Sequence, residues 1–201
     1  LGVGTNEKYY VQYGGAYYDI TPLRATTSAG DVTFAATDGS SIVTVTEASH
    51  GAIVGDFVTF SGAATLGGTI TAEVLNQEYK IATTPTANTF TIIAREVNPV
   101  SRITVNGIYT PVAVAANSSD SGNGGGSTVG AYQISIGLNT SVTGDGWNAG
   151  TWSRGTWNSA TTPTIQDDLR LWTHDNFGED LIINLYNGGL FYYDSSGGLT
   201  N

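Results

Sequence analysis

Apolar and polar residues alternate along much of the chain, which predicts β-strands. Residues 41–46 read Ser-Ile-Val-Thr-Val-Thr, and comparable runs at 57–60, 78–81 and 89–93 are bounded by Gly, Asn or Pro. Side chains of a strand point alternately to its two faces, so each run has one apolar face to bury. We expect 57–60 to pair with both 78–81 and 89–93. Residues 30–97 would then close into a small β-barrel, which hides the sheet edges.

Tyrosines crowd the first part of the chain, residues 1–29. Five of them flank the pair Gly14 and Gly15, namely Tyr9, Tyr10, Tyr13, Tyr17 and Tyr18. Two glycines between aromatic runs predict a β-hairpin, in which the tyrosines pair across the strands. Stacking against carbohydrate would use the same residue type. No cluster of acids or Asn accompanies these tyrosines, however, so we favour the structural interpretation.

The composition changes in residues 98–130. Residues 102–114 could supply one or two strands, whereas 117–127 consist only of Asn, Ser, Asp and Gly. This composition is typical of a linker or surface loop, and it predicts the main domain boundary of the chain. A phosphate-binding loop is also rich in glycine, but the required Gly-Lys-Ser/Thr ending is missing and no Lys lies nearby.

Strand signals resume in the last part of the chain, residues 131–201. Residues 131–137 alternate again, and two apolar-aromatic runs, 181–186 and 190–194, flank the sequence Asn-Gly-Gly. An Asn-Gly-Gly connection between two such runs is a strong hairpin signal. The whole chain is therefore expected to be all-β: a small β-barrel followed by an antiparallel sheet.

All four tryptophans lie close together in this last part, and three of them recur at a spacing of five residues. Neither a strand nor a helix places such a series on one stripe. The glycines that precede the Thr-Trp pairs favour bends that return each ring to a buried surface. We therefore expect a packing seam or interface. Its candidate residues are Trp147, Trp152, Trp157, Trp172, Phe177, Tyr192 and Tyr193.

Charge and composition narrow the range of functions. The formal net charge is -10, with 7 Lys and Arg against 17 Asp and Glu, which argues against nucleic acid as a partner. The chain has no Cys and no apolar run long enough to cross a membrane, so we expect neither a thiolate metal site nor a membrane partner. Its Leu start and the absence of Met suggest a segment of a longer polypeptide.

Few residues fit a catalytic role. His50 could act in acid–base chemistry, but no Ser, Asp or Glu is spaced with it as in a known nucleophile arrangement. We expect His50 to hold a turn by hydrogen bonding to the backbone, and Asp56, which follows a Gly, to do the same. We therefore predict that the chain is not an enzyme and that it has no cofactor.

An acidic cluster near the C-terminus is the remaining candidate for chemistry, with Asp167, Asp168, Asp175, Glu179 and Asp180. Carboxylates beside aromatic rings are what a glycoside hydrolase uses, although the spacing does not require that function. Asp175, Glu179 and Asp180 could also bind a cation. The Asp-Xaa-Asp-Xaa-Asp-Gly order of a helix-loop-helix calcium site is absent, however. Turn and strand-end roles explain these acids without any ligand, and we favour them.

Several of the motifs in residues 30–97 resemble a known module. The segments 43–45, 50–51, 55–62, 79–81 and 88–92 are similar to a small β-barrel module of tailed-bacteriophage virion proteins. The same module resembles a half-domain named after the first catalytic cysteine region of ubiquitin-activating enzymes. That name implies no activity in this chain, because it has no Cys to act as a nucleophile.

A second resemblance covers the C-terminal motifs. Residues 169–181 and 188–194, with 17–24 near the start, resemble a signature of tail-associated structural proteins of tailed phages. The resemblance implies a propeller-blade or sandwich setting for the last sheet. It also implies a non-enzymatic virion component of the tail, neck or baseplate that assembles with other virion proteins and with copies of itself. The alternative is an adhesin that recognises a glycan on the host surface.

Overall fold

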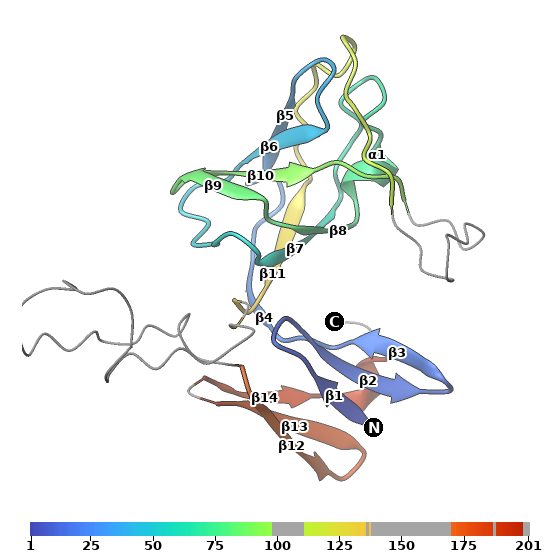
Figure 1. Cartoon of the computed structure of the whole chain (residues 1–201), viewed down its shortest axis with the longest axis vertical. Helices are drawn as coiled ribbons and strands as arrows, with labels where there is room; N and C mark the ends of the chain where they lie inside the picture. The colour runs from blue at the N-terminus through green and yellow to red at the C-terminus, as the bar shows by residue number, and fades with distance from the viewer. Residues whose placement is uncertain (98–110, 136, 138–169, 187, 199–201) are drawn as a thin grey trace, which may run out of the picture. The chain divides into compact units, whose positions relative to one another are not determined.

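The computed structural model describes residues 1–97, 111–135, 137, 170–186 and 188–198 of the chain (Figure 1). These residues form four antiparallel sheets, one short helix, α1 (Ala72–Leu75), and one 3-10 turn, η3 (Ser195–Gly197). The predicted all-β class is therefore confirmed. In this part of the chain, no helix has the length and apolarity that a membrane crossing requires.

The chain divides into two compact units. Unit 1 combines Leu1–Pro22 with Ser135–Asn201, and unit 2 comprises Leu23–Ile134. The first and last segments of the chain thus belong to the same unit. No local pattern in the sequence signals this association, because it depends on contacts between distant residues.

Unit 2 consists of two four-stranded antiparallel sheets. In spatial order, the first contains β5 (Thr33–Ala36), β6 (Ile42–Thr46), β10 (Thr89–Ile93) and β9 (Thr83–Thr86). The second contains β4 (Leu23–Thr26), β11 (Val129–Gln133), β7 (Phe57–Ser61) and β8 (Glu78–Lys80).

The closed barrel expected for residues 30–97 is wrong for the described part of the chain, since neither sheet of unit 2 closes on itself. Strand β7 pairs with β8, as expected, but its other edge pairs with β11. Strand β10 instead lies between β6 and β9. Both edges of each central strand are therefore occupied, and β7 and β10 stay in separate sheets.

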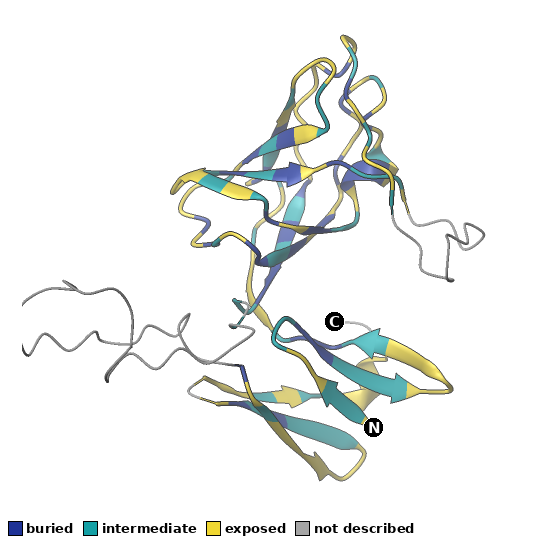
Figure 2. Cartoon of the chain, in the orientation of Figure 1, coloured by how far each residue is buried: buried dark blue, intermediate teal, exposed yellow. Residues whose placement is uncertain are grey.

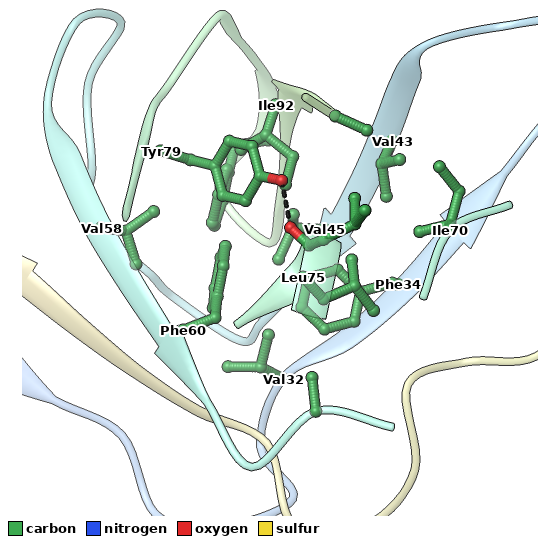
Figure 3. Packing of buried hydrophobic residues seen from close by; sticks show 14 of the residues in the cluster. Val32, Phe34, Val43, Val45, Val58, Phe60, Ile70, Leu75, Tyr79 and Ile92 are labelled. Carbon is green, nitrogen blue, oxygen red and sulfur yellow. Dashed lines mark hydrogen bonds between the residues drawn. The ribbon is translucent and has the colours of Figure 1, made fainter. Parts of the chain in front are cut away.

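The two sheets of unit 2 share one apolar core, which Figure 2 shows as the buried residues and Figure 3 shows in close-up. Residues of β5, β6, β7, β8, β10 and β11 point into it, such as Val45 of β6 and Ile92 of β10, both fully buried. The ring of Phe60 lies at the centre, 5.1 Å from the Phe34 ring and 6.4 Å from the Phe90 ring, centroid to centroid. The alternation predicted from the sequence therefore sets which side chains enter the core.

The Gly/Ser-rich segment 117–127 is a surface loop that packs onto unit 2, the second of the two alternatives that its composition predicts, and not a linker between domains. The carbonyl of Asn123 accepts a hydrogen bond from Phe34 N at 3.0 Å, and the carbonyl of Gly124 accepts one from Ala64 N at 2.7 Å. The segment thus covers the outer edge of β5. Several of its backbone groups thus find partners in the protein, among them Gly122 N, which donates to the carbonyl of Leu66 at 2.7 Å.

Asp120 anchors this segment. Only 5% of the residue is exposed, and its carboxylate accepts five hydrogen bonds of 2.8–3.1 Å. The donors are the backbone N–H groups of Gly68, Thr69, Ile70 and Asn117 and the hydroxyl of Thr69. Burial by itself would raise the pKa of Asp120, but these hydrogen bonds outweigh it and hold the pKa below its ordinary value.

Close packing explains two of the four glycines of this segment. Gly124 has φ +84°, and a Cβ there would lie 2.4 Å from Phe34 Cδ2. A Cβ at Gly122 would lie 2.8 Å from the carbonyl oxygen of Leu66. Only glycine fits these two positions, so Gly122 and Gly124 reflect tight contact with the rest of unit 2.

Unit 1 consists of two three-stranded antiparallel sheets. The first contains β1 (Gly2–Gly4), β2 (Tyr9–Tyr13) and β3 (Ala16–Asp19), and the second contains β12 (Trp172–Phe177), β13 (Asp180–Leu185) and β14 (Leu190–Tyr193). Both predicted hairpins are confirmed, β2–β3 and β13–β14. In the first, Gly14 and Gly15 have φ +59° and +86°, which the tight turn requires.

Replacing Asp120 by Asn should destabilise unit 2 by about 2–3 kcal/mol at pH 7, because an amide leaves some of the five donors unpaired. The effect should also depend on pH. The pKa of Asp120 is lower in the folded chain than in the unfolded chain, where it is about 3.9. Its stabilisation is therefore present above about pH 4 and is lost as the pH falls through the folded pKa.

Urea unfolding of the wild type and of Asp120→Asn between pH 7 and pH 3 measures this effect. The difference in stability between the two proteins should shrink in acid. Asp38→Asn, at an exposed turn position, is the matched control and should leave both the stability and its pH dependence unchanged. A constant difference between wild type and Asp120→Asn across this range would contradict the assignment.

Replacing Gly124 by Ala should destabilise unit 2 by roughly 2–4 kcal/mol, since the methyl group meets the Phe34 ring and the left-handed backbone adds strain. Gly39 has a similar φ of +76°, but a Cβ there meets no atom within 4 Å. Gly39→Ala should therefore cost only about 1 kcal/mol, from the backbone alone. Equal losses in chemical denaturation of the two variants would show that the segment does not press on Phe34.

Candidate functional site

Unit 1 has a small core at which its two sheets meet. Tyr9 of β2 lies with its ring 5.1 Å from the Trp172 ring and 5.8 Å from the His174 ring, both on β12. The indole N–H of Trp172 donates to the carbonyl of Thr5 at 2.6 Å. Tyr9, Ile20 and Ile183 are the fully enclosed members of this core. Its inward-facing residues alternate along each strand with residues that face outward.

A cavity of about 890 Å³ adjoins this core. The lining includes the rings of Tyr13 and Tyr193 and the polar side chains of His174, Asn176 and Ser195. The remaining lining residues are Leu1, Gly2, Val11, Glu179, Asp180 and Leu181. On β2, Val11 and Tyr13 follow Tyr9 at alternate positions, so the same face of the strand runs from the core into the cavity.

The hydroxyl of Tyr9 lies directly behind the cavity wall. Tyr9 is fully buried, and its hydroxyl has no hydrogen-bond partner. A Cβ at Gly2 would lie 2.1 Å from this hydroxyl and 3.2 Å from His174 Cε1, so the three groups meet at one point. Burial raises the pKa of Tyr9 to about 12, and the phenol therefore keeps its proton at neutral pH.

Asp180 links β13 to the C-terminal segment at the rim of the cavity. One carboxylate oxygen accepts hydrogen bonds from the backbone N–H of Ser195 at 2.9 Å and from its hydroxyl at 3.0 Å. The other oxygen accepts one from the hydroxyl of Tyr192. The Tyr192 bond, followed by those from Ser195, lowers the pKa of Asp180, and the same bond to the carboxylate raises the pKa of Tyr192.

The outer face of the β12–β13–β14 sheet carries exposed apolar side chains. Phe177 is 64% exposed, Leu190 is 69% exposed and Tyr192 is 59% exposed. Phe177 is paired with Asp180, and Tyr192 with Ile182, so these side chains lie on one face of the sheet. Leu181 and Ile183 point to the other face, which is directed inward. Alternation thus divides this sheet between a cavity face and an outer apolar face.

The seven residues predicted for the packing seam fall into three groups. Trp147, Trp152 and Trp157 lie outside the described residues. Trp172 and Tyr193 are half-buried and pack against the core of unit 1. Phe177 and Tyr192 are exposed on its outer face. The sequence pattern did not find Tyr9, Gly2 and His174 as a group, because they meet only when the two ends of the chain come together.

The acidic cluster takes structural positions where it is described. Asp175 accepts a hydrogen bond from the adjacent Asn176 N–H at 2.8 Å, and both oxygens of Asp180 are engaged. Asp167 and Asp168 lie outside the described residues. Across the described ranges, no three His, Cys, Asp or Glu side chains gather as a group that could hold a metal ion. Cation binding at Asp175, Glu179 and Asp180 therefore gains no geometric support.

His50 and Asp56 occupy turns of unit 2, which confirms their predicted roles. His50 Nδ1 accepts a hydrogen bond from Ala52 N at 3.0 Å, so Nε2 carries the proton and donates to the Thr86 carbonyl at 3.1 Å. A carboxylate oxygen of Asp56 accepts from Ile53 N at 3.1 Å. Both ring nitrogens of His50 are thus used in holding the backbone.

No protein-family model matches the chain, and no curated protein matches it in sequence. Among solved structures it is similar to the phage phi92 endosialidase, at 14% sequence identity and a TM-score of 0.33. The match covers 97% of this chain and 24% of the endosialidase chain. This chain therefore spans about a quarter of that protein, and the TM-score is too low to establish a common fold.

Replacing Tyr192 by Phe should raise the pKa of Asp180 toward the ordinary value of an aspartate, because the carboxylate loses a hydrogen bond that favours its charged form. Carboxyl chemical shifts followed by NMR over a pH titration measure this pKa. Tyr186→Phe, another exposed tyrosine of unit 1, should leave the Asp180 titration unchanged. The same titration curve in Tyr192→Phe and the wild type would rule out this hydrogen bond.

Proposed function

We propose that the chain is a non-enzymatic structural component of a tailed-phage virion, in the tail, neck or baseplate, and that it works by protein–protein assembly. The observation that carries this proposal is the apolar surface that unit 1 leaves exposed. Among the described residues, its large exposed apolar side chains are Leu1, Tyr13, Tyr17, Leu171, Phe177, Tyr186, Leu190 and Tyr192. Aromatic side chains of this kind anchor protein interfaces effectively.

The contrast between the two units supports this function. Unit 2 buries a continuous apolar core between its sheets, whereas the core of unit 1 centres on Tyr9, Ile20 and Ile183. Among the described residues, unit 1 thus buries less apolar surface than unit 2. Contact with a partner through the outer face of β12–β13–β14 would bury further apolar area and stabilise unit 1.

The partners we propose are other virion proteins and further copies of the chain. The placement in a virion rests on the resemblance of residues 169–181 and 188–194 to tail-associated structural proteins. A non-enzymatic role is supported by the way that candidate catalytic groups are used. Both nitrogens of His50 and both carboxylate oxygens of Asp180 are engaged in holding turns and strand ends.

The double variant Phe177→Ser and Leu190→Ser tests the role of the outer face. Both side chains are mainly exposed, so unit 1 should still fold, while the protein should be incorporated into particles at least several-fold less. Incorporation is measured by quantitative mass spectrometry of purified particles, and particle shape by electron microscopy. A matched control is Ile42→Ser with Val54→Ser, which removes apolar side chains of similar exposure from unit 2.

The control variant should be incorporated at the wild-type level. Wild-type incorporation of Phe177→Ser/Leu190→Ser into normal particles would contradict assembly through this face. If those particles also failed to adsorb to the host, the result would favour receptor binding in place of a scaffolding role.

A further inference from the structure

The buried hydroxyl of Tyr9 lacks a partner that most buried polar groups have. A buried donor left unpaired costs about 1–3 kcal/mol, so such groups in native proteins are usually satisfied by a protein atom, a water or a ligand. The hydroxyl lies against Gly2 and His174, and both of these residues line the cavity of unit 1. The hydroxyl fills the place that a Cβ at Gly2 would take, 2.1 Å from it, so it is enclosed behind the cavity wall that Gly2 and His174 form.

The cavity has the size and the composition of a small-molecule site. Its volume of about 890 Å³ lies within the range of ligand pockets, roughly 300–1,000 Å³. Tyr13 and Tyr193 contribute aromatic rings, while Val11 and Leu181 contribute apolar surface. A few polar groups come from separate elements, as is common in pockets that fix the orientation of a ligand.

Charge limits the class of ligand. Among the described residues, no Lys or Arg lines the cavity, whereas Glu179 and Asp180 do, and the chain carries a formal net charge of -10. An anion would therefore be repelled. Asp180 already accepts hydrogen bonds from Ser195 and Tyr192, and no group of three His, Cys, Asp or Glu gathers in the described part of the chain to hold a metal ion. A neutral ligand fits this balance best.

We propose that the cavity of unit 1 binds a neutral oligosaccharide. The rings of Tyr13 and Tyr193 offer apolar surfaces to the faces of the sugar rings. The Asn176 amide and the Ser195 hydroxyl each donate and accept, which matches sugar hydroxyls that do both. The proposal uses the inner face of the sheet and does not depend on assembly through the outer face.

Saturation-transfer NMR with the full chain tests the proposal. The neutral probes are oligosaccharides of glucose, of galactose and of N-acetylglucosamine. Sialyllactose serves as the anionic probe and arginine as the cationic probe. We expect a signal from at least one neutral probe, and binding at least tenfold weaker for sialyllactose and for arginine.

Variants locate the binding. Tyr13→Ala and Asn176→Ala should each weaken the binding of the neutral probe at least tenfold. Tyr17→Ala should have no effect, because Tyr17 is 62% exposed on the same hairpin, close to the 68% of Tyr13, but does not line the cavity. Circular dichroism and thermal melting confirm that each variant is folded.

Three results would overturn the proposal. The first is the absence of a signal from every neutral probe at millimolar concentration. The second is equal or tighter binding of sialyllactose or arginine. The third is a folded Tyr13→Ala variant that binds as well as the wild type. None of these results bears on the particle experiment, so the two proposals fail separately.

Discussion

The structure depends on one constraint: each strand has two faces, and only a second layer can bury the apolar one. Unit 2 satisfies this constraint by facing two four-stranded sheets around the ring of Phe60. The segment 117–127 then seals the edge of β5, and the buried carboxylate of Asp120 holds that segment in place. The apolar core and the hydrogen-bonded carboxylate of Asp120 thus hold unit 2 together.

Unit 1 meets the same constraint less completely. Its two sheets pack together around Tyr9. Next to this contact, the same faces of the two sheets line the cavity. Outward-facing Phe177, Leu190 and Tyr192 have no covering layer among the described residues. The functional surfaces of the chain therefore lie where the burial of strand faces is incomplete, and this is why unit 1 carries both proposals.

Local signals in the sequence predicted the local elements. Alternation found β6, β7, β8 and β10, and paired glycines found the β2–β3 and β13–β14 hairpins. Long-range pairing left no such signal, so β11 beside β7 and the closure of unit 1 from both chain ends were missed. The composition of residues 117–127 did not distinguish a linker from a surface loop, because glycines occur both in flexible linkers and in a backbone that packs closely, as Gly124 does against Phe34. The unpaired hydroxyl of Tyr9 could not be predicted from the sequence either, because only the fold brings it next to Gly2 and His174.

The two faces of the β12–β13–β14 sheet also explain why its register must be fixed. Leu181 lines the cavity while its neighbour Ile182 faces outward, so a slip of one residue would exchange the two surfaces. Two features prevent such a slip. Gly178, with φ +73°, sets the β12–β13 turn, and Asp180 ties the start of β13 to Ser195 beyond β14. Asp180, which suggests catalysis from the sequence, thus helps to keep the proposed binding face and the proposed assembly face apart.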